Sequence, residues 1–137
     1  MEITQQFNSE VMQTGWFSRQ QTVIVAVSAG VDSMVLLTLM QQLPTQIRPK
    51  LVVAHVNHQL RSQSQVEAQF MSDYCQHHHL QLEKTKWPVA EQPYQGVEAA
   101  ARHFRYQFFA QCMGRHHAAV LLTAHHADDQ AETVLIS

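Results

Sequence analysis

Cysteine, membrane-spanning segments and positive charge are scarce or missing in this sequence of 137 residues. Only two cysteines occur, Cys75 and Cys112. They are far apart and form no Cys-x-x-Cys pair, which fits a protein kept in a reducing compartment. No apolar stretch is long enough to cross a membrane, and the N-terminus is polar rather than signal-like. We therefore predict a cytoplasmic protein that has no membrane partner.

The charge balance gives no general nucleic-acid surface. Nine lysines and arginines against eleven aspartates and glutamates leave a formal net charge of −2, whereas a tRNA-binding protein normally shows a basic face. Either the partner is small, or a basic surface lies on a part of the protein that this sequence does not include. With 45% hydrophobic residues, the chain is expected to bury a core as one globular domain.

The most informative stretch, residues 22–43, combines a predicted strand, a short turn and a predicted helix. The apolar, mostly β-branched run 23–27 predicts a strand buried on both faces, and strong helix formers follow the turn until Pro44. Such a turn directs backbone N–H groups and the positive end of a helix at an anion. We therefore predict an anion site, with a turn that binds nothing as the alternative. The turn consists of Ser28, Ala29, Gly30, Val31, Asp32 and Ser33.

The residues of this turn exclude two common phosphate-binding motifs. The turn has no lysine and is too short for Gly-x-x-x-x-Gly-Lys-Ser/Thr, and it does not follow Gly-x-Gly-x-x-Gly. Its pattern, Ser-x-Gly-x-Asp-Ser directly after a strand, resembles the loop of the ATP pyrophosphatase (PP-loop) family. In that family the loop holds pyrophosphate. Glycine is usual there at the position of Ala29, where a methyl group is tolerable only if φ is negative.

The rest of the chain predicts alternating helices and strands. Further strands are expected at 51–54, 80–85 and 118–123, and helices at 1–20, 64–79 and 96–113. A last helix is expected to begin near Ala124. This alternation predicts an α/β fold, an open, Rossmann-like parallel sheet with strand order 3-2-1-4 and helices on both faces. The residues expected to share one side of helix 64–79 are Val66, Phe70, Tyr74 and Cys75.

Polar residues follow two of the predicted strands. Ligands of open α/β sheets bind beyond the carboxyl ends of the strands, where the chain direction across the sheet reverses. The predicted order makes strands 23–27 and 118–123 neighbours, so the turn 28–33 should lie beside the segment 125–129. A polar loop and an acidic helix cap are the alternative explanations. The polar residues are His55, Asn57, His58 and Arg61 after the second strand, and His125, His126, Asp128 and Asp129 after the fourth.

A charged stripe runs along the predicted helix 96–113. Glu98, Arg102 and Arg105 follow helical spacing on a face other than the apolar one. An exposed, salt-bridged face would explain the stripe, and so would an arginine that reaches a phosphate. The spacing alone leaves both interpretations open.

Four segments, taken in order, resemble one family within this superfamily. They are Ser-Ala-Gly-Val-Asp-Ser (28–33), His-Val-Asn-His-Gln-Leu-Arg (55–61), Glu-Ala-Ala-Ala-Arg-His-Phe-Arg-Tyr (98–106) and Leu-Leu-Thr-Ala-His-His-Ala-Asp-Asp-Gln-Ala-Glu-Thr (121–133). Over about residues 20–137 they resemble the N-terminal catalytic domain of the tRNA(Ile)-lysidine synthetases. That family uses ATP and Mg²⁺ to adenylate the first anticodon cytidine of tRNA(Ile) with the anticodon CAU. L-lysine then displaces AMP, which gives lysidine.

The resemblance also implies roles for individual residues. The turn 28–33 would cradle the ATP phosphates, with His55, Asn57 and His58 as further ATP-binding residues. Asp32 would help to position magnesium or pyrophosphate. The residues expected at the reaction centre are Asp32, Arg105, His125 and Asp129.

The resemblance implies a division of the chain and two departures from the family. Residues 1–20 would form an N-terminal helix, and 21–137 a PP-loop ATP-binding domain truncated before its last strand, with the C-terminal tRNA-binding domains absent. An exposed sheet edge would then favour aggregation or a homodimer. Gln59, like Ala29, stands where glycine is usual. We expect these residues alone to bind ATP weakly and to form no lysidine.

Three other functions remain open on the sequence alone. A tRNA thiolation enzyme of the same superfamily would need paired cysteines. A metal hydrolase built on His125, His126, Asp128 and Asp129 would leave the turn 28–33 unexplained. A non-catalytic nucleotide-binding module would leave Arg105, His125 and Asp129 without a role.

Overall fold

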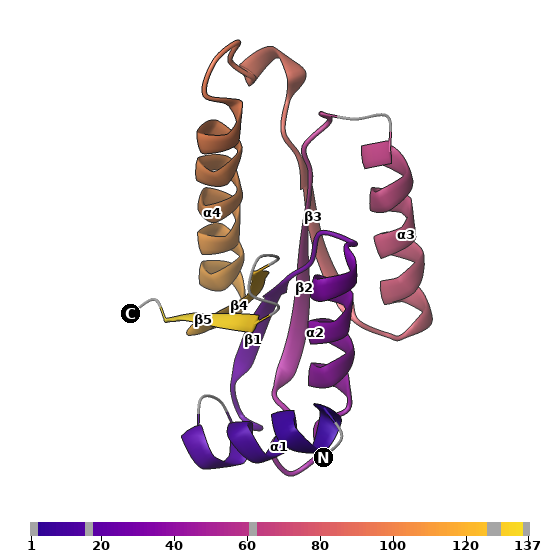
Figure 1. The fold of residues 1–137 in the computed structure, drawn as a ribbon, viewed down its shortest axis with the longest axis vertical. Coiled ribbons are helices and arrows are strands. Elements are labelled where there is room, and N and C mark those ends of the chain that lie inside the picture. Colours follow the sequence, from indigo (N-terminus) through magenta and orange to yellow (C-terminus); the bar gives the residue numbers. More distant parts are fainter. Residues whose placement is uncertain (1–2, 16–17, 61–62, 126–129, 136–137) are drawn as a thin grey trace.

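The computed structural model describes residues 3–15, 18–60, 63–125 and 130–135, and it forms an α/β sandwich around one sheet (Figure 1). The sheet has the order β3-β2-β1-β4-β5. The strands are β1 Thr22–Ala26, β2 Lys50–Asn57, β3 Gln81–Lys86, β4 Val120–His125 and β5 Gln130–Leu135. The helices are α1 Ile3–Thr14, α2 Val31–Gln41, α3 Gln63–His77, the 3₁₀ turn η1 Val89–Glu91 and α4 Val97–His116.

The predicted order 3-2-1-4 is confirmed, because β1 pairs in parallel with both β2 and β4, and β2 pairs in parallel with β3. Val25 lies opposite Val53 on one side and Leu122 on the other. These three residues are almost completely buried, as expected for strands with a helix layer on each face.

Each face of the sheet has its own hydrophobic core. Val23, Val25 and Val27 point to the face covered by α1, α2 and α3, where they pack with residues such as Met40 and Met71. Ile24 points to the opposite face, which α4 covers with Phe108, Phe109, Cys112 and Met113. Alternate residues of one strand thus serve the two cores. The predicted helices on both faces are confirmed.

The last segment of the chain was predicted wrongly. We expected a helix from Ala124 onward, but residues 130–135 form β5, which pairs antiparallel with β4. Alanine, glutamate and leucine favour a helix in isolation. In the fold, the outer edge of β4 offers unpaired backbone groups, and a returning strand satisfies them. Pairing across the sheet therefore overrides the local helix propensity.

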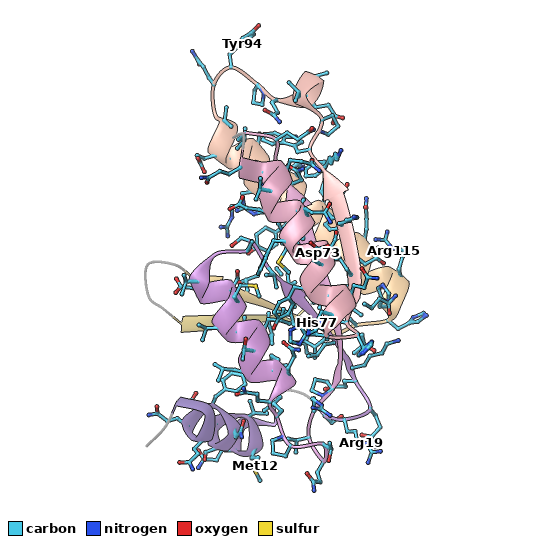
Figure 2. The ribbon with its side chains drawn as sticks, turned by 90° about the vertical axis from the view of Figure 1, so that its right-hand side faces the viewer. Met12, Arg19, Asp73, His77, Tyr94 and Arg115 are labelled. Atoms are coloured by element: carbon cyan, nitrogen blue, oxygen red, sulfur yellow. The ribbon has the colours of Figure 1, made fainter. Side chains whose placement is uncertain are left out.

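The buried face of α3 also differs from the prediction. Cys75 is buried and Tyr74 packs against the core as predicted. Val66 and Phe70, however, are 69% and 46% exposed, and Met71 is buried in their place. The helix carries two apolar stripes at helical spacing, and spacing alone does not say which one faces the sheet. Figure 2 looks onto the outer side of α3, where Asp73 and His77 point away from the sheet.

Two further observations concern an ion pair at the edge of the sheet and the apolar character of the helices. Arg115, near the end of α4, forms an ion pair with Glu83 of β3 at 3.2 Å, and it joins the helix to the edge of the sheet (Figure 2). Among the described helices, none combines the length and the apolar character needed to cross a membrane.

Candidate functional site

A cavity of about 670 Å³ lies at the carboxyl ends of β1, β2 and β4. Residues from the turn after β1, the end of β2, α3, α4 and the end of β4 all contribute to its wall. These include Ser28, Ser33, His55, Asn57, His58, Ser64, Glu67, Glu98, Arg102, Arg105, Tyr106, Thr123 and Ala124. From β1 the chain proceeds through β2 to β3 on one side, and it then returns through α4 to β4 on the other side of β1, so the cavity sits at the topological switch point between β1 and β4.

The turn 28–33 was predicted to lie beside the segment that follows β4, and the structure describes only the first part of that region. Thr123 and Ala124 line the same cavity as Ser28 and Ser33, although the two segments are far apart in sequence. His125 is the last residue of β4 and lies opposite Gln130 in the antiparallel register. Asp129, the other predicted catalytic residue of this segment, lies outside the described residues.

Hydrogen bonds inside the turn 28–33 fix its shape. The hydroxyl of Ser33 accepts from the Ser28 N–H at 3.1 Å and donates to the Gly30 carbonyl at 3.1 Å, while the Gly30 N–H donates to Ser28 Oγ at 3.3 Å. A Cβ at Gly30 would lie 3.3 Å from Ser28 Oγ, so the position favours glycine. Helix α2 begins at Val31, and its first N–H groups have no acceptor within the helix. The turn therefore presents backbone donors and a positive helix end to the cavity.

The two positions that depart from the family's glycines both have left-handed backbones. Ala29 has φ +71° and Gln59 has φ +55°, in the region that L-residues avoid. The condition stated for Ala29, a negative φ, is therefore not met. The loop keeps the glycine-like conformation with a methyl group in place.

His55 and Asn57 are buried members of β2 rather than parts of a polar loop. His55 is 3% exposed, and its Nδ1 lies 2.7 Å from the carbonyl oxygen of Val27. Burial lowers the pKa of His55 below its ordinary value, and the bond to Val27 and the charge of Glu67 oppose that shift. The ring is therefore neutral near neutral pH.

Two glutamine side chains hold the rim of the cavity. The Gln59 N–H donates to Asn57 Oδ1 at 3.0 Å, and Gln59 Nε2 donates to the Trp87 carbonyl at 2.9 Å. Gln92 Nε2 donates to the His58 carbonyl at 2.7 Å. His58 also meets Trp87 edge-on, with ring centroids 6.3 Å apart. Asn57 thus positions the chain after β2, and it also lines the cavity, so its predicted contact with ATP stays a prediction.

The cavity wall formed by α4 carries two arginines. Within the described part of the chain, neither Arg102 nor Arg105 has an ion-pair partner, so the stripe is not a salt-bridged face there. The guanidinium of Arg102 lies 5.0 Å from the centroid of the Tyr106 ring. Two cations facing the cavity favour the second interpretation of the stripe, an arginine that reaches a phosphate.

The sequence did not predict that α3 would form part of the cavity wall. Ser64 and Glu67 line the cavity at the first turns of α3, and Thr123 contributes a buried hydroxyl from β4. Ser64 and Glu67 fit a helix cap equally well, so their sequence context gave no sign of a ligand.

Together these groups suit a ligand with an anionic part and a polar uncharged part. The turn and the arginines supply positive potential for phosphates. A neutral imidazole, hydroxyls and apolar strand residues line the remainder.

Comparison with known proteins identifies the family of this chain. The PP-loop domain family matches residues 1–137. The tRNA(Ile)-lysidine synthase of Lactiplantibacillus plantarum is 54% identical over 132 residues, which cover 96% of this chain and 30% of the relative. That of Enterococcus faecalis is 51% identical, covering 96% and 28%. The chain therefore spans about 30% of the length of these curated relatives.

A solved structure with the same architecture is the U34-tRNA thiolase NcsA from Methanococcus maripaludis with its [4Fe-4S] cluster. It superimposes with a TM-score of 0.71 at 15% sequence identity, covering 91% of this chain and 45% of the thiolase. At that identity the similarity shows a shared fold.

Proposed function

Because this chain belongs to the PP-loop domain family, we propose that it binds ATP in the cavity at the carboxyl ends of β1, β2 and β4. We propose further that it is the ATP-binding domain of a tRNA(Ile)-lysidine synthase, a cytoplasmic ligase. The observation that carries the proposal is that one cavity is lined by Ser28 and Ser33 at the two ends of the turn, by the arginines of α4 and by the end of β4. The identity of 54% to a protein of that name supports it.

The proposed reaction has two steps. The C2 oxygen of the first anticodon cytidine, in tRNA(Ile) with the anticodon CAU, attacks the α-phosphorus of ATP, and pyrophosphate leaves. The side-chain amine of free L-lysine then attacks C2 of the adenylated cytidine and gives up a proton, and AMP leaves. Lysidine, AMP and pyrophosphate are the products.

The residues of the cavity can be matched to the first step. The turn 28–33 and the N-terminus of α2 would hold the departing pyrophosphate through backbone N–H groups. Arg105 would offset the negative charge that develops on the α-phosphate. His55 and His58 would line the side of the cavity that is left for the nucleoside.

The second step would depend on the end of β4. His125 would accept the proton of the incoming amine, and Asp129 would orient that histidine or hold the lysine ammonium. The position of His125 at the carboxyl end of β4 supports this role.

We propose that magnesium arrives with the nucleotide and binds beside the turn. Mg²⁺ usually keeps several waters and takes one or two carboxylates together with substrate phosphates. Asp32 lies in the first turn of α2, and a nearby hydroxyl comes from Ser33. We propose that Asp32 holds the ion, which would neutralise charge on the phosphates.

The two cysteines are not paired as the thiolation alternative would require. Cys75 packs in the core between the sheet and α3, and Cys112 in the core beneath α4, so the sheet separates them. Burial raises the pKa of each thiol to about 11, so neither is an activated nucleophile near neutral pH.

The domain boundaries are part of the proposal. We place the PP-loop ATP-binding domain at 21–137, with residues 1–20 as a helical addition that packs against it. The tRNA would be bound largely by other domains, because this chain has a net charge of −2 and lacks a basic excess.

Two measurements test the function. Isothermal titration calorimetry would measure ATP binding to residues 1–137, for which weak binding is expected. Mass spectrometry would measure lysidine in tRNA(Ile) treated with ATP, lysine and a chimera, in which these residues replace the matching part of the L. plantarum relative. Arg105→Ala in the chimera should lower turnover by about a hundredfold or more.

The exposed Arg19→Ala variant is the matched control for loss of a positive charge away from the cavity, and it should keep full turnover. ATP binding by a chimera that forms no lysidine would overturn the proposed reaction. It would leave a nucleotide-binding module.

A further inference from the structure

One nitrogen of His55 is buried without a hydrogen-bond partner in the described part of the chain. This atom is Nε2, and the residue that carries it is 97% buried and belongs to the wall of the cavity. Buried polar groups in proteins are nearly always hydrogen-bonded, to the chain, to water or to a ligand. The unsatisfied nitrogen therefore indicates a partner that the described residues do not supply.

The hydrogen bond of the other ring nitrogen determines what kind of partner fits. Nδ1 lies 2.7 Å from the Val27 carbonyl oxygen, and a carbonyl only accepts, so Nδ1 carries the proton. In the neutral ring Nε2 is then an acceptor. Burial lowers the pKa of His55, which keeps the ring neutral. The group that pairs with Nε2 must therefore donate an N–H or O–H.

The position of His55 relates this acceptor to the phosphate turn. Val27, to which the ring is anchored, directly precedes Ser28 in the chain. His55 comes from β2, the strand beside β1, and the first turns of α3 line the same side of the cavity with Ser64 and Glu67. A nucleotide whose phosphates lie in the turn would place its ribose or base against this wall.

We propose that His55 is a specificity-determining residue whose Nε2 accepts a hydrogen bond from the nucleoside part of ATP. The donor is either the exocyclic amine of adenine or a ribose hydroxyl. If it is the amine, a 6-oxo purine is rejected as well, because its oxygen would face the imidazole lone pair. The inference rests on the proposed ATP binding but adds to it, since the turn itself recognises only phosphates.

Nucleotide analogues identify the donor on the unaltered protein. Calorimetric titrations would compare ATP with purine riboside triphosphate, which lacks the amine, and with 2′-deoxy- and 3′-deoxy-ATP. Inorganic tripolyphosphate serves as the probe of the turn alone. Loss of the hydrogen bond should weaken one of the three analogues about tenfold relative to ATP. Equal affinity for all four nucleotides would overturn the role of His55.

A variant then tests whether His55 is the residue that discriminates between ATP and its analogues. In His55→Asn the amide N–H replaces Nδ1–H as the donor to the Val27 carbonyl, while no group replaces Nε2. This variant should bind ATP as weakly as the discriminated analogue and should bind tripolyphosphate like the original protein. Retained discrimination would refute the proposal.

The outcomes also separate this inference from the function on which it rests. A protein that binds neither ATP nor tripolyphosphate contradicts the proposed ATP site itself. A protein that binds both, without discriminating among the analogues, contradicts only the role of His55. The analogue titrations need no substitution, so they decide the matter even if His55→Asn does not fold.

Discussion

Replacing Ala29 with glycine should stabilise the fold, although glycine usually destabilises. An L-residue in the left-handed region costs about 1–2 kcal/mol, and Ala29→Gly removes that cost at φ +71°. Glycine loses about 0.5–1 kcal/mol more conformational entropy on folding than alanine does. The half-buried methyl group, which packs against the core beside α2, contributes about 0.4 kcal/mol. The net expectation is a gain of about 0.4 kcal/mol in the free energy of unfolding.

A control variant makes this small gain measurable. Ala110→Gly, at an exposed position inside α4, carries the same entropic cost without the relief of strain, and it should destabilise by about 0.5–1 kcal/mol. Equilibrium unfolding in urea would compare the two variants. We expect the free energies of unfolding to differ by about 1 kcal/mol, with Ala29→Gly the more stable. Two equally destabilised variants would show that the turn stores no backbone strain.

Two further predictions concern the rim and the edge of the sheet. Gln59→Gly should leave the free energy of unfolding nearly unchanged, because relief at φ +55° offsets the lost bond to the Trp87 carbonyl. Gln59→Ala keeps the strain but loses the bond, so it should destabilise by about 1 kcal/mol in urea unfolding; equal stability of the two variants would contradict this account. The hydrogen bond from His116 holds the pKa of Glu83 below its ordinary value, so charged Glu83 stabilises the fold near neutral pH and stabilises it less as the pH falls through the lowered pKa. Unfolding of Glu83→Gln from pH 7 to about 3 should show a deficit that disappears at the acid end, and a pH-independent deficit would refute the reasoning.

The order of the parallel strands could be predicted from the sequence for physical reasons. Buried runs such as 23–27 and 118–123 need helices on both faces, and right-handed crossovers then restrict the order of the strands. The same topology predicted that the turn after β1 and the end of β4 would share a cavity. These inferences depend on chain connectivity, which the sequence contains.

The parts that could not be predicted depend on choices among nearly equal local alternatives. Residues 130–135 have helical propensity, and only the exposed edge of β4 selects a strand. Both apolar stripes of α3 satisfy helical spacing. His55 and Asn57 look like loop residues because buried polar side chains are uncommon inside strands, and their partners become visible only after folding.

Trp87 gives the cavity an intrinsic optical signal. Its indole is 3% exposed and meets the edge of the His58 ring, and His58 lines the cavity. Indole emission responds to the polarity and protonation of such a neighbour. After replacement of Trp16 by phenylalanine, the emission of Trp87 alone would follow the filling of the cavity. Nucleotide occupancy could then be timed in a stopped-flow instrument without a label.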